Sequence, residues 1–317
     1  MKKILAIMMA LMLLVGACAL AEGETYKIGI LQQLQHPALD LATQGFRDAL
    51  TELLGDAVEF DEQNASNEPT LCATIANGFV SADVDLIMAN ATTALQSAVA
   101  ATEDIPILGT SITHYGTALD MNDDWQGYTG INVSGTADLA PLDGQATMIQ
   151  ELFPDAETVG LLYCSAEPNS VYQIDTIQGY LEELGFTCNR YAFTDSNDIA
   201  SVVTLACDEI DVLYIPTDNA AASNTETIRN VVEPAGIPVV AGEESICQGC
   251  GVATLTISYY DIGYKTGEMA YDVLVNGADI STMEIAFAPQ FTKKYNAEMA
   301  DIMGVTIPDD YEAIEEA

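Results

Sequence analysis

Short runs of hydrophobic residues alternate along the chain with longer stretches in which apolar positions recur every three or four residues. The run "YKIGIL" (26–31) precedes the periodic stretch "ALDLATQGFRDALTELLG" (38–55), and "VDLIMAN" (84–90) precedes "TTALQSAVAAT" (92–102). Short apolar runs are typical of buried strands, and the longer periodic stretches are typical of amphipathic helices. Strands that alternate with helices predict βαβ units and a parallel sheet.

Four segments of the first half recur in the same order in the second half. The matched segments are "YKIGILQQLQHPA" (26–38) with "TVGLLYCSAEPNS" (158–170), "TQGFRDALTELLG" (43–55) with "IQGYLEELGF" (177–186), "VDLIMANATTALQS" (84–97) with "IDVLYIPTDNAAAS" (210–223), and "DIPILGTSIT" (104–113) with "GIPVVAGEES" (236–245). A chain of 317 residues is long enough for two hydrophobic cores. The repeat therefore predicts two similar α/β lobes, and "GYTGINVSGTADLAP" (127–141) between them is predicted to be a crossover.

Polar side chains follow the predicted strands. Open parallel sheets bind ligands beyond the carboxyl ends of their strands, so two facing lobes should enclose a cleft lined by these residues. The predicted ligand-binding residues are Gln35, His36, Asn90, Thr92, Thr93 and Ser111 in the first lobe, and Ser165, Glu167, Asn169, Ser170, Asp218, Asn219 and Glu243 in the second. His36 follows the first predicted strand, so we interpret it as a cleft residue, with Pro37 setting the start of a helix. No recognisable triad motif supports a catalytic role for it. A metal site shared with His114 is the less favoured alternative.

The charge of the chain restricts the ligand. The net charge is −39, which disfavours nucleic acid and anionic lipid headgroups as partners. Beyond the N-terminal segment, the basic residues are Lys27, Arg47, Arg190, Arg229, Lys265, Lys293 and Lys294, and none follows a predicted strand. A phosphate or dicarboxylate ligand would normally need such a residue in the cleft.

A zwitterion suits the remaining groups. A single carboxylate can be held by the amides at the helix starts near Thr92 and Asn169. An ammonium group needs an anion, for which Asp218 is the first candidate and Glu243 and Glu167 are the alternatives. The competing interpretation of the Thr and Asn residues is helix capping alone, and that of Asp218 is an Asx turn. The pattern predicts an amino acid as the ligand, with no cofactor and no metal.

The N-terminus is predicted to be a signal segment over residues 1–21. Lys2 and Lys3 precede the apolar run "ILAIMMALMLLVGA" (4–17). "VGAC" (15–18) is typical of a lipoprotein signal, in which Cys18 would be lipidated, whereas "ALA" (19–21) fits ordinary cleavage after Ala21. The chain is therefore expected to be exported, as a cell-surface lipoprotein anchored to the membrane or as a periplasmic or secreted protein.

The remaining cysteines are Cys72, Cys164, Cys188, Cys207, Cys247 and Cys250. Only "CQGC" (247–250) is a close pair, and it is predicted to lie in a Gly-rich loop. A zinc site would need a second pair or nearby histidines, which the sequence does not offer. We favour a local disulfide or two free thiols over a redox motif.

Several of these segments together resemble a known family. "IGILQQLQHPALDLATQGFRDAL", "GLLYCSAEPNSVYQ", "YIPTDNAAAS", "IPVVAGEE" and "GVATLTISYYDIGYKTGEMA" are similar to the substrate-binding proteins of ABC transporters, and more narrowly to the subfamily that includes binders of tryptophan and other aromatic amino acids. The resemblance covers nearly all of the chain beyond the signal segment.

The resemblance implies a type I periplasmic-binding fold, in which two Rossmann-like lobes with parallel sheets are joined by a three-crossover hinge. It implies hinge closure around a small solute, an ABC permease in the membrane as partner, and no catalysis. On this basis we expect an N-terminal lobe of residues 25–133 plus 258–279 and a C-terminal lobe of residues 134–257 plus 280–317.

The predicted function is an extracytoplasmic receptor for a small zwitterion. The first alternative is the same fold binding a nucleoside or a sugar. The second is an exported α/β enzyme, which is disfavoured because the sequence contains neither a nucleophile elbow nor a P-loop, and no GxGxxG follows the first strand. Turnover of a bound ligand would support the enzyme.

Overall fold

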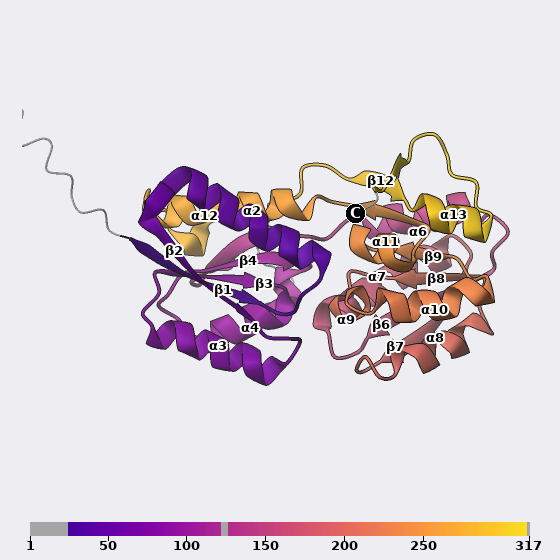
Figure 1. Cartoon of the computed structure of the whole chain (residues 1–317), viewed down its shortest axis with the longest axis horizontal. Coiled ribbons are helices and arrows are strands. Elements are labelled where there is room, and N and C mark those ends of the chain that lie inside the picture. Colours follow the sequence, from indigo (N-terminus) through magenta and orange to yellow (C-terminus); the bar gives the residue numbers. More distant parts are fainter. Residues whose placement is uncertain (1–24, 122–125, 316–317) are drawn as a thin grey trace, which may run out of the picture.

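The computed structural model describes residues 25–121 and 126–315, which form two α/β lobes side by side (Figure 1). The predicted signal segment, with Cys18, lies outside these residues. Within the described ranges, no helix has the length and apolar character needed to cross a membrane.

The first lobe is built on a six-stranded parallel sheet with the order β11-β5-β4-β3-β1-β2. Its strands are β1 (Tyr26–Gln32), β2 (Val58–Asn64), β3 (Leu86–Asn90), β4 (Ile107–Ile112), β5 (Val133–Ala137) and β11 (Ala286–Phe287). Its helices are α2 (Pro37–Leu54), α3 (Pro69–Ser81), α4 (Thr92–Ala101), α5 (Tyr115–Ala118) and α12 (Tyr259–Leu274), with 3-10 turns at Gly55–Ala57 and Ile280–Thr282.

The second lobe is built on a seven-stranded sheet with the order β13-β12-β10-β9-β8-β6-β7, which is parallel except between β10 and β12. Its strands are β6 (Thr158–Cys164), β7 (Thr187–Phe193), β8 (Val212–Ile215), β9 (Val239–Ala241), β10 (Ala253–Thr256), β12 (Thr292–Tyr295) and β13 (Glu312–Ala313). Its helices are α6 (Leu142–Leu152), α7 (Pro168–Glu183), α8 (Ile199–Cys207), α9 (Asn219–Ala222), α10 (Thr225–Ala235), α11 (Glu244–Cys250) and α13 (Ala297–Met303).

The internal repeat of the sequence corresponds to a repeat of the fold. The orders β2-β1-β3-β4-β5 and β7-β6-β8-β9-β10 are the same, and both are the doubly wound order in which ligands bind where the strand order reverses. In each lobe, helices cover both faces of the sheet; in the first, α2 and α12 lie on one face and α3 and α4 on the other (Figure 1). The central strands β3, β4, β5, β8 and β9 are therefore buried on both faces, which explains their nearly continuous apolar sequences.

The helix that leads into the site is defined by its ends. α2 begins at Pro37, where the missing N–H is harmless, and ends at Gly55, which has a positive φ of 58°. α2 packs closely against α12 because Gly45, Gly263 and Gly267 have no side chains at the contact: a Cβ at Gly263 would overlap the carbonyl oxygen of Ala42. This contact places the starts of the two helices next to each other.

The chain crosses between the lobes three times, at residues 138–141, 257–258 and 288–291, and we call these three segments the hinge. The predicted crossover 127–141 contains the first crossing, but strand β5, which was not predicted, precedes that crossing within the segment. The sheets assign β5 and β11 to the first lobe, so the first and third crossings come after Ala137 and Phe287, a few residues later than the expected boundaries at 134 and 280.

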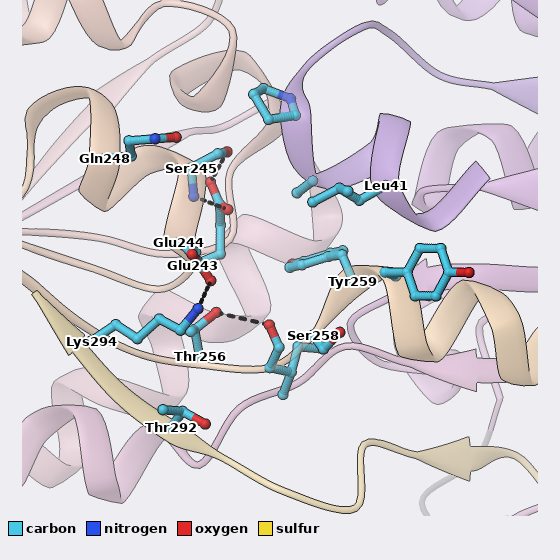
Figure 2. A pocket seen from close by; sticks show the side chains of 14 residues that line it. Leu41, Glu243, Glu244, Ser245, Gln248, Thr256, Ser258, Tyr259, Thr292 and Lys294 are labelled. Carbon is cyan, nitrogen blue, oxygen red and sulfur yellow. Dashed lines mark hydrogen bonds and ion pairs between the residues drawn. The ribbon is translucent and has the colours of Figure 1, made fainter. Parts of the chain in front are cut away.

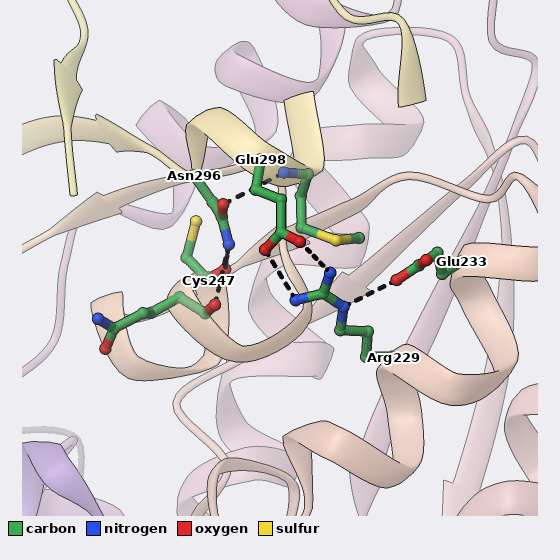
Figure 3. Close-up of polar contacts among 7 residues, drawn as sticks. Arg229, Glu233, Cys247, Asn296 and Glu298 are labelled. Atoms are coloured by element: carbon green, nitrogen blue, oxygen red, sulfur yellow. Dashed lines mark hydrogen bonds and ion pairs between the residues drawn. The ribbon is translucent and has the colours of Figure 1, made fainter. Parts of the chain in front are cut away.

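The C-terminal segment is attached to the second lobe by a polar contact (Figure 3). Asn296 accepts a hydrogen bond from the backbone N–H of Met299 and donates two from its amide, to the carbonyls of Cys247 and Gln248 at 3.2 and 2.9 Å. Arg229 forms an ion pair of 2.8 Å with the exposed Glu298. The side chain of Asn296 therefore caps α13 and fixes it to the end of α11.

The close cysteine pair lies in a helix, not in a loop as predicted. Cys247 and Cys250 belong to α11, are fully buried and are free thiols, as are the other four cysteines of the described chain. Burial raises the pKa of both thiols, which keeps them protonated. Neither the disulfide nor a reactive redox pair is present in this structure.

Candidate ligand-binding site

A small polar cavity lies between the lobes, at the carboxyl ends of strands from both sheets. It is lined by His36, Leu39, Ser111, Thr113, Asp138, Asn169, Thr217, Asp218, Asn219, Ala222, Glu243 and Tyr259. Six of these were predicted from the sequence: His36, Ser111, Asn169, Asp218, Asn219 and Glu243. The repeat explains why they meet, because equivalent strand ends of the two lobes face each other.

The lobes touch across this cavity. His36, at the start of α2, has its Nε2 atom 3.2 Å from Oδ1 of Asn219, at the start of α9. The rings of His114 and Tyr172 stack across the lobes, with centroids 4.4 Å apart and an interplanar angle of 4°. The two histidines thus have separate partners in the second lobe. The lobes are in a closed arrangement.

A buried network sets the orientation of His36. The Nδ2 atom of Asn219 donates to Oε2 of Glu167 at 2.7 Å, so the Oδ1 atom of Asn219 faces His36. His36 must then donate from Nε2. Burial is the main cause that lowers the pKa of His36 and favours the neutral ring. In the neutral ring with Nε2 protonated, Nδ1 is a hydrogen-bond acceptor.

Four side-chain atoms of the cavity are buried without a hydrogen-bond partner among the described residues. They are Nδ1 of His36, Oγ of Ser111, Oδ1 of Asp138 and Oδ1 of Asn169. The Nδ2 atom of Asn169 faces Oε2 of Glu167 at 3.3 Å and the carbonyl of Thr217 at 3.0 Å, which leaves its Oδ1 as an acceptor. Buried polar atoms are normally paired, so their concentration in one cavity is typical of a binding site.

The cavity is acidic. Asp138, Asp218 and Glu243 line it, and its lining contains no Lys or Arg within the described ranges. Burial raises the pKa of all three carboxyl groups, and that of Asp138 reaches about 6. A multiply anionic ligand would therefore find no basic partner in this lining.

The predicted ammonium partners are occupied by helix starts. Asp218 accepts hydrogen bonds from the backbone N–H groups of Cys164 at 2.6 Å and Ala221 at 2.8 Å. Glu243 accepts from the start of α11, and Glu167 accepts from the backbone of Asn219 and Ala220 at the start of α9. The side chains of Asp218 and Glu243 thus cap α9 and α11, whereas Glu167 binds the start of α9 and makes no capping contact with its own helix α7.

The other predicted residues lie outside the cavity. Gln35, Thr93 and Glu167 line a larger interlobe groove at the outer edge of the cleft. Asn90 donates to the carbonyl of Leu39 and to Thr43, which attaches α2 to β3, and Thr92 is buried at the start of α4. Two further residues make contacts within the second lobe: the exposed Ser165 donates to the carbonyl of Phe193, and the buried Ser170 accepts from Asn169.

Sequence reasoning missed two residues on hinge segments or next to them. Asp138 directly follows β5, which had been assigned to a crossover, and Tyr259 begins α12 directly after the second crossing. The hydroxyl of Tyr259 donates to Oδ2 of Asp138 at 2.9 Å. The rule that polar residues at strand ends line the cleft would have found Asp138, had β5 been predicted.

A second groove lies on the hinge side of the cavity (Figure 2). Glu243 and Tyr259 belong to the walls of both. Figure 2 shows Leu41 on the side of the first lobe and Glu244, paired with Lys294 at 2.7 Å, on the side of the second. The apolar residues of the groove include Pro37, Ala38, Leu41 and Ile257.

Comparisons with known proteins identify related chains. A family model described as "ABC transporter substrate binding protein" matches residues 27–314. A "tyrosine-binding protein" of Clostridioides difficile (strain R20291) is 35% identical over 253 residues, which are 78% of this chain and 72% of the relative.

Two solved structures show the same architecture at similar identity. A domain from "Streptococcus pneumonia" in complex with L-Trp is 31% identical, covers 92% of this chain and 100% of its own, and has a TM-score of 0.87. A ligand-free, open substrate-binding protein with adhesive properties from Clostridium difficile is 33% identical with the same coverage, and has a TM-score of 0.70. The present chain is therefore more similar to the complex than to the open protein.

Proposed function

Because the chain belongs to the family of ABC transporter substrate-binding proteins, we propose that it is the receptor of an importer for an aromatic amino acid, which it binds in the interlobe cavity. The family assigns solute binding and not catalysis. The observation that carries the proposal is the set of four buried, unpartnered polar atoms that line one cavity between the two lobes.

The nature of these atoms favours an amino group. Nδ1 of His36, Oδ1 of Asp138 and Oδ1 of Asn169 are acceptors, and Oγ of Ser111 can donate or accept. An ammonium group has three N–H donors and a positive charge, which suits three acceptors beside carboxylates. The hydroxyl of Ser111 can donate to the carboxylate of the same amino acid.

The aromatic side chain is supported by the relatives. The C. difficile relative is named for tyrosine, and the S. pneumoniae structure contains L-Trp. The higher TM-score against that complex fits a closed receptor, since the same hinge is open in the ligand-free relative. We expect tyrosine, tryptophan or phenylalanine to be the preferred ligand, with a nucleoside or a sugar as the alternative in this fold.

The location and the partner belong to the same proposal. Residues 1–21 are proposed to direct export, and Cys18 to carry the lipid that holds the receptor at the membrane. An ABC permease is the proposed partner. Mass spectrometry of the exported protein tests this: an N-terminal lipidated Cys18 is expected, and a chain that begins after Ala21 would exclude the anchor.

A thermal-shift screen tests the ligand. The protein is unfolded and refolded to remove bound solute, and its melting temperature is recorded with amino acids, nucleosides and sugars. A ligand at a hundred times its dissociation constant stabilises the folded state by about 2.7 kcal/mol. A shift with aromatic amino acids is expected. Shifts with only aliphatic or polar amino acids would refute the aromatic ligand, and shifts with only nucleosides or sugars would refute the amino-acid receptor.

A further inference from the structure

We infer that Asp138 binds the amino group of the ligand and thereby couples the ligand's positive charge to closure of the hinge. The inference rests on the proposed function and makes it more specific. It assigns the ammonium contact to a residue of the hinge instead of the carboxylates at the helix starts. It also implies that a ligand without an amino group should fail to close the lobes efficiently.

The position of Asp138 is the first reason. It is the first residue of the first crossing, and its backbone N–H donates to the carbonyl of Ile112 at the end of β4. Its Oδ2 atom accepts the hydroxyl of Tyr259, which directly follows the second crossing. This hydrogen bond connects the first crossing to the residue that directly follows the second crossing, 121 residues later in the sequence. A group that binds Asp138 therefore acts on the hinge directly.

The second reason is the unpaired oxygen. Asp138 is only 5% exposed, and its Oδ1 atom has no partner among the described residues. The neighbouring Glu243 is another buried carboxyl group, and the lining of the cavity has no Lys or Arg to balance either charge. A buried, unbalanced carboxylate disfavours the closed form until a cation reaches it.

The alternatives are less available. Asp218 and Glu243 each accept backbone hydrogen bonds with both oxygens, so an ammonium group would compete with helix starts for them. The first residue after Asp138 that belongs to a helix is Leu142, and Asp138 caps no helix. Its Oδ1 atom is the carboxylate oxygen of the cavity that a ligand can approach without displacing a protein contact.

The consequence is a difference between the two states. When the lobes open, water can reach Asp138 and solvate its charge. When they close without a ligand, the charge loses that water and gains nothing. An ammonium ligand replaces the water, so closure becomes favourable only with an amine in the cavity. The hydroxyl of Tyr259 keeps the carboxylate in position for this contact.

The test compares L-tyrosine with its des-amino analogue, 3-(4-hydroxyphenyl)propanoate. Both compounds are titrated by calorimetry into the full-length chain, purified in mild detergent and refolded to remove bound solute. The variants are Asp138→Asn, Tyr259→Phe and, as a matched control, Asp261→Asn on the exposed side of α12. Small-angle scattering of each protein without ligand reports how far the lobes are closed.

We expect the wild type and Asp261→Asn to prefer L-tyrosine by roughly 10- to 100-fold, the range for a hydrogen bond to a charged group. Asp138→Asn should lose most of this preference, and it should be more compact than the wild type without ligand. Tyr259→Phe keeps the charge, so it should bind L-tyrosine more weakly and still prefer it to the analogue.

Three results would overturn the inference. If Asp138→Asn keeps the wild-type preference, the amino group is bound elsewhere, although the receptor function stands. If Asp138→Asn and Tyr259→Phe weaken the binding of L-tyrosine and of its des-amino analogue equally, Asp138 has only a structural role. If the wild type binds no amino acid at all, the proposed function fails, and this inference fails with it.

Discussion

The closure equilibrium should depend on pH through Asp138, and the sign follows from its environment. Burial raises its pKa from the ordinary value of 3.8 to about 6 in the closed structure, while the hydrogen bond from Tyr259 opposes this shift. A group whose pKa is higher in the closed form takes up a proton on closing. Acid therefore favours closure of the ligand-free protein, and this advantage is lost as the pH rises through about 6.

The magnitude can be calculated from the two pKa values. If the open form restores the ordinary value, the charge of Asp138 opposes closure by about 3 kcal/mol at pH 7.5 and by about 1.5 kcal/mol at pH 5. Asp138→Asn removes this term at every pH. The closed-to-open ratio of the variant should exceed that of the wild type by roughly 150-fold at pH 7.5 and by roughly 15-fold at pH 5.

The comparison with the variant separates Asp138 from its neighbours. His36 changes the pH dependence of closure in the opposite direction to Asp138. Burial lowers the pKa of His36, so its protonation in acid favours the open form. Burial also raises the pKa of Asp218 and Glu243, and of the nearby Tyr115 and Tyr259. These groups are present in the wild type and in Asp138→Asn. Their contributions therefore cancel to first order when the closed-to-open ratios of the two proteins are compared.

Fluorescence transfer between one dye on each lobe measures the ratio. Each protein is titrated without ligand from pH 7.5 to pH 5. We expect the difference between the wild type and Asp138→Asn to narrow toward pH 5. A difference that is constant across this range would refute the reasoning, because it would show that the carboxyl group does not change its protonation on closing.

Three further predictions concern stability and reactivity. Gly263→Ala should lower the free energy of unfolding by roughly 1–3 kcal/mol, because the new methyl overlaps the backbone of α2. The control Gly179→Ala, whose Cβ meets nothing within 4 Å, should leave the free energy of unfolding unchanged or raise it. Denaturant unfolding measures both variants, and equal effects would contradict the packing argument. Asn296→Ala should lower the free energy of unfolding by roughly 2 kcal/mol, because it removes the cap of α13 and two further hydrogen bonds. Loss of the exposed Glu298 carboxylate should change the melting temperature little. A larger effect at Glu298 than at Asn296 would be inconsistent with the contacts in Figure 3. Cys247 should resist iodoacetamide in the native protein and react after unfolding, as followed by mass spectrometry; rapid native labelling would show that α11 opens.

The architecture could be predicted because it depends on local patterns. Alternating apolar runs and amphipathic stretches give the βαβ units, and the order of the repeated segments indicates two lobes. Helix α2 was predicted almost to its last residue, because Pro37 and Gly55 are unambiguous signals at its ends. The predicted approach of polar strand ends is seen for His36 and Asn219, which lie in different lobes.

The failures occur where tertiary contacts override the local signal. Gly135, with a positive φ of 140°, interrupts the apolar pattern of β5, yet a side chain there would overlap the backbone of Gly109 in the neighbouring strand β4. The glycine permits close pairing instead of breaking the strand. In "CQGC", Gly249 similarly packs directly against Thr225, and Glu243 caps the helix. No pattern within a single segment reveals either contact.

The same distinction explains which acidic residues are available to a ligand. A carboxylate just after a strand usually precedes a helix, and the orphan N–H groups of that helix are its nearest donors. In the second lobe, Asp218 and Glu243 accept from the starts of the helices that follow them, whereas Glu167 accepts from the start of α9 and not from its own helix α7. Asp138 also follows a strand, but the chain there crosses to the other lobe. The next helix is α6, and its N-cap is Pro141 and not Asp138. No helix start competes for its Oδ1 atom, so a carboxylate at a crossing remains open to a ligand where its counterparts at helix starts do not.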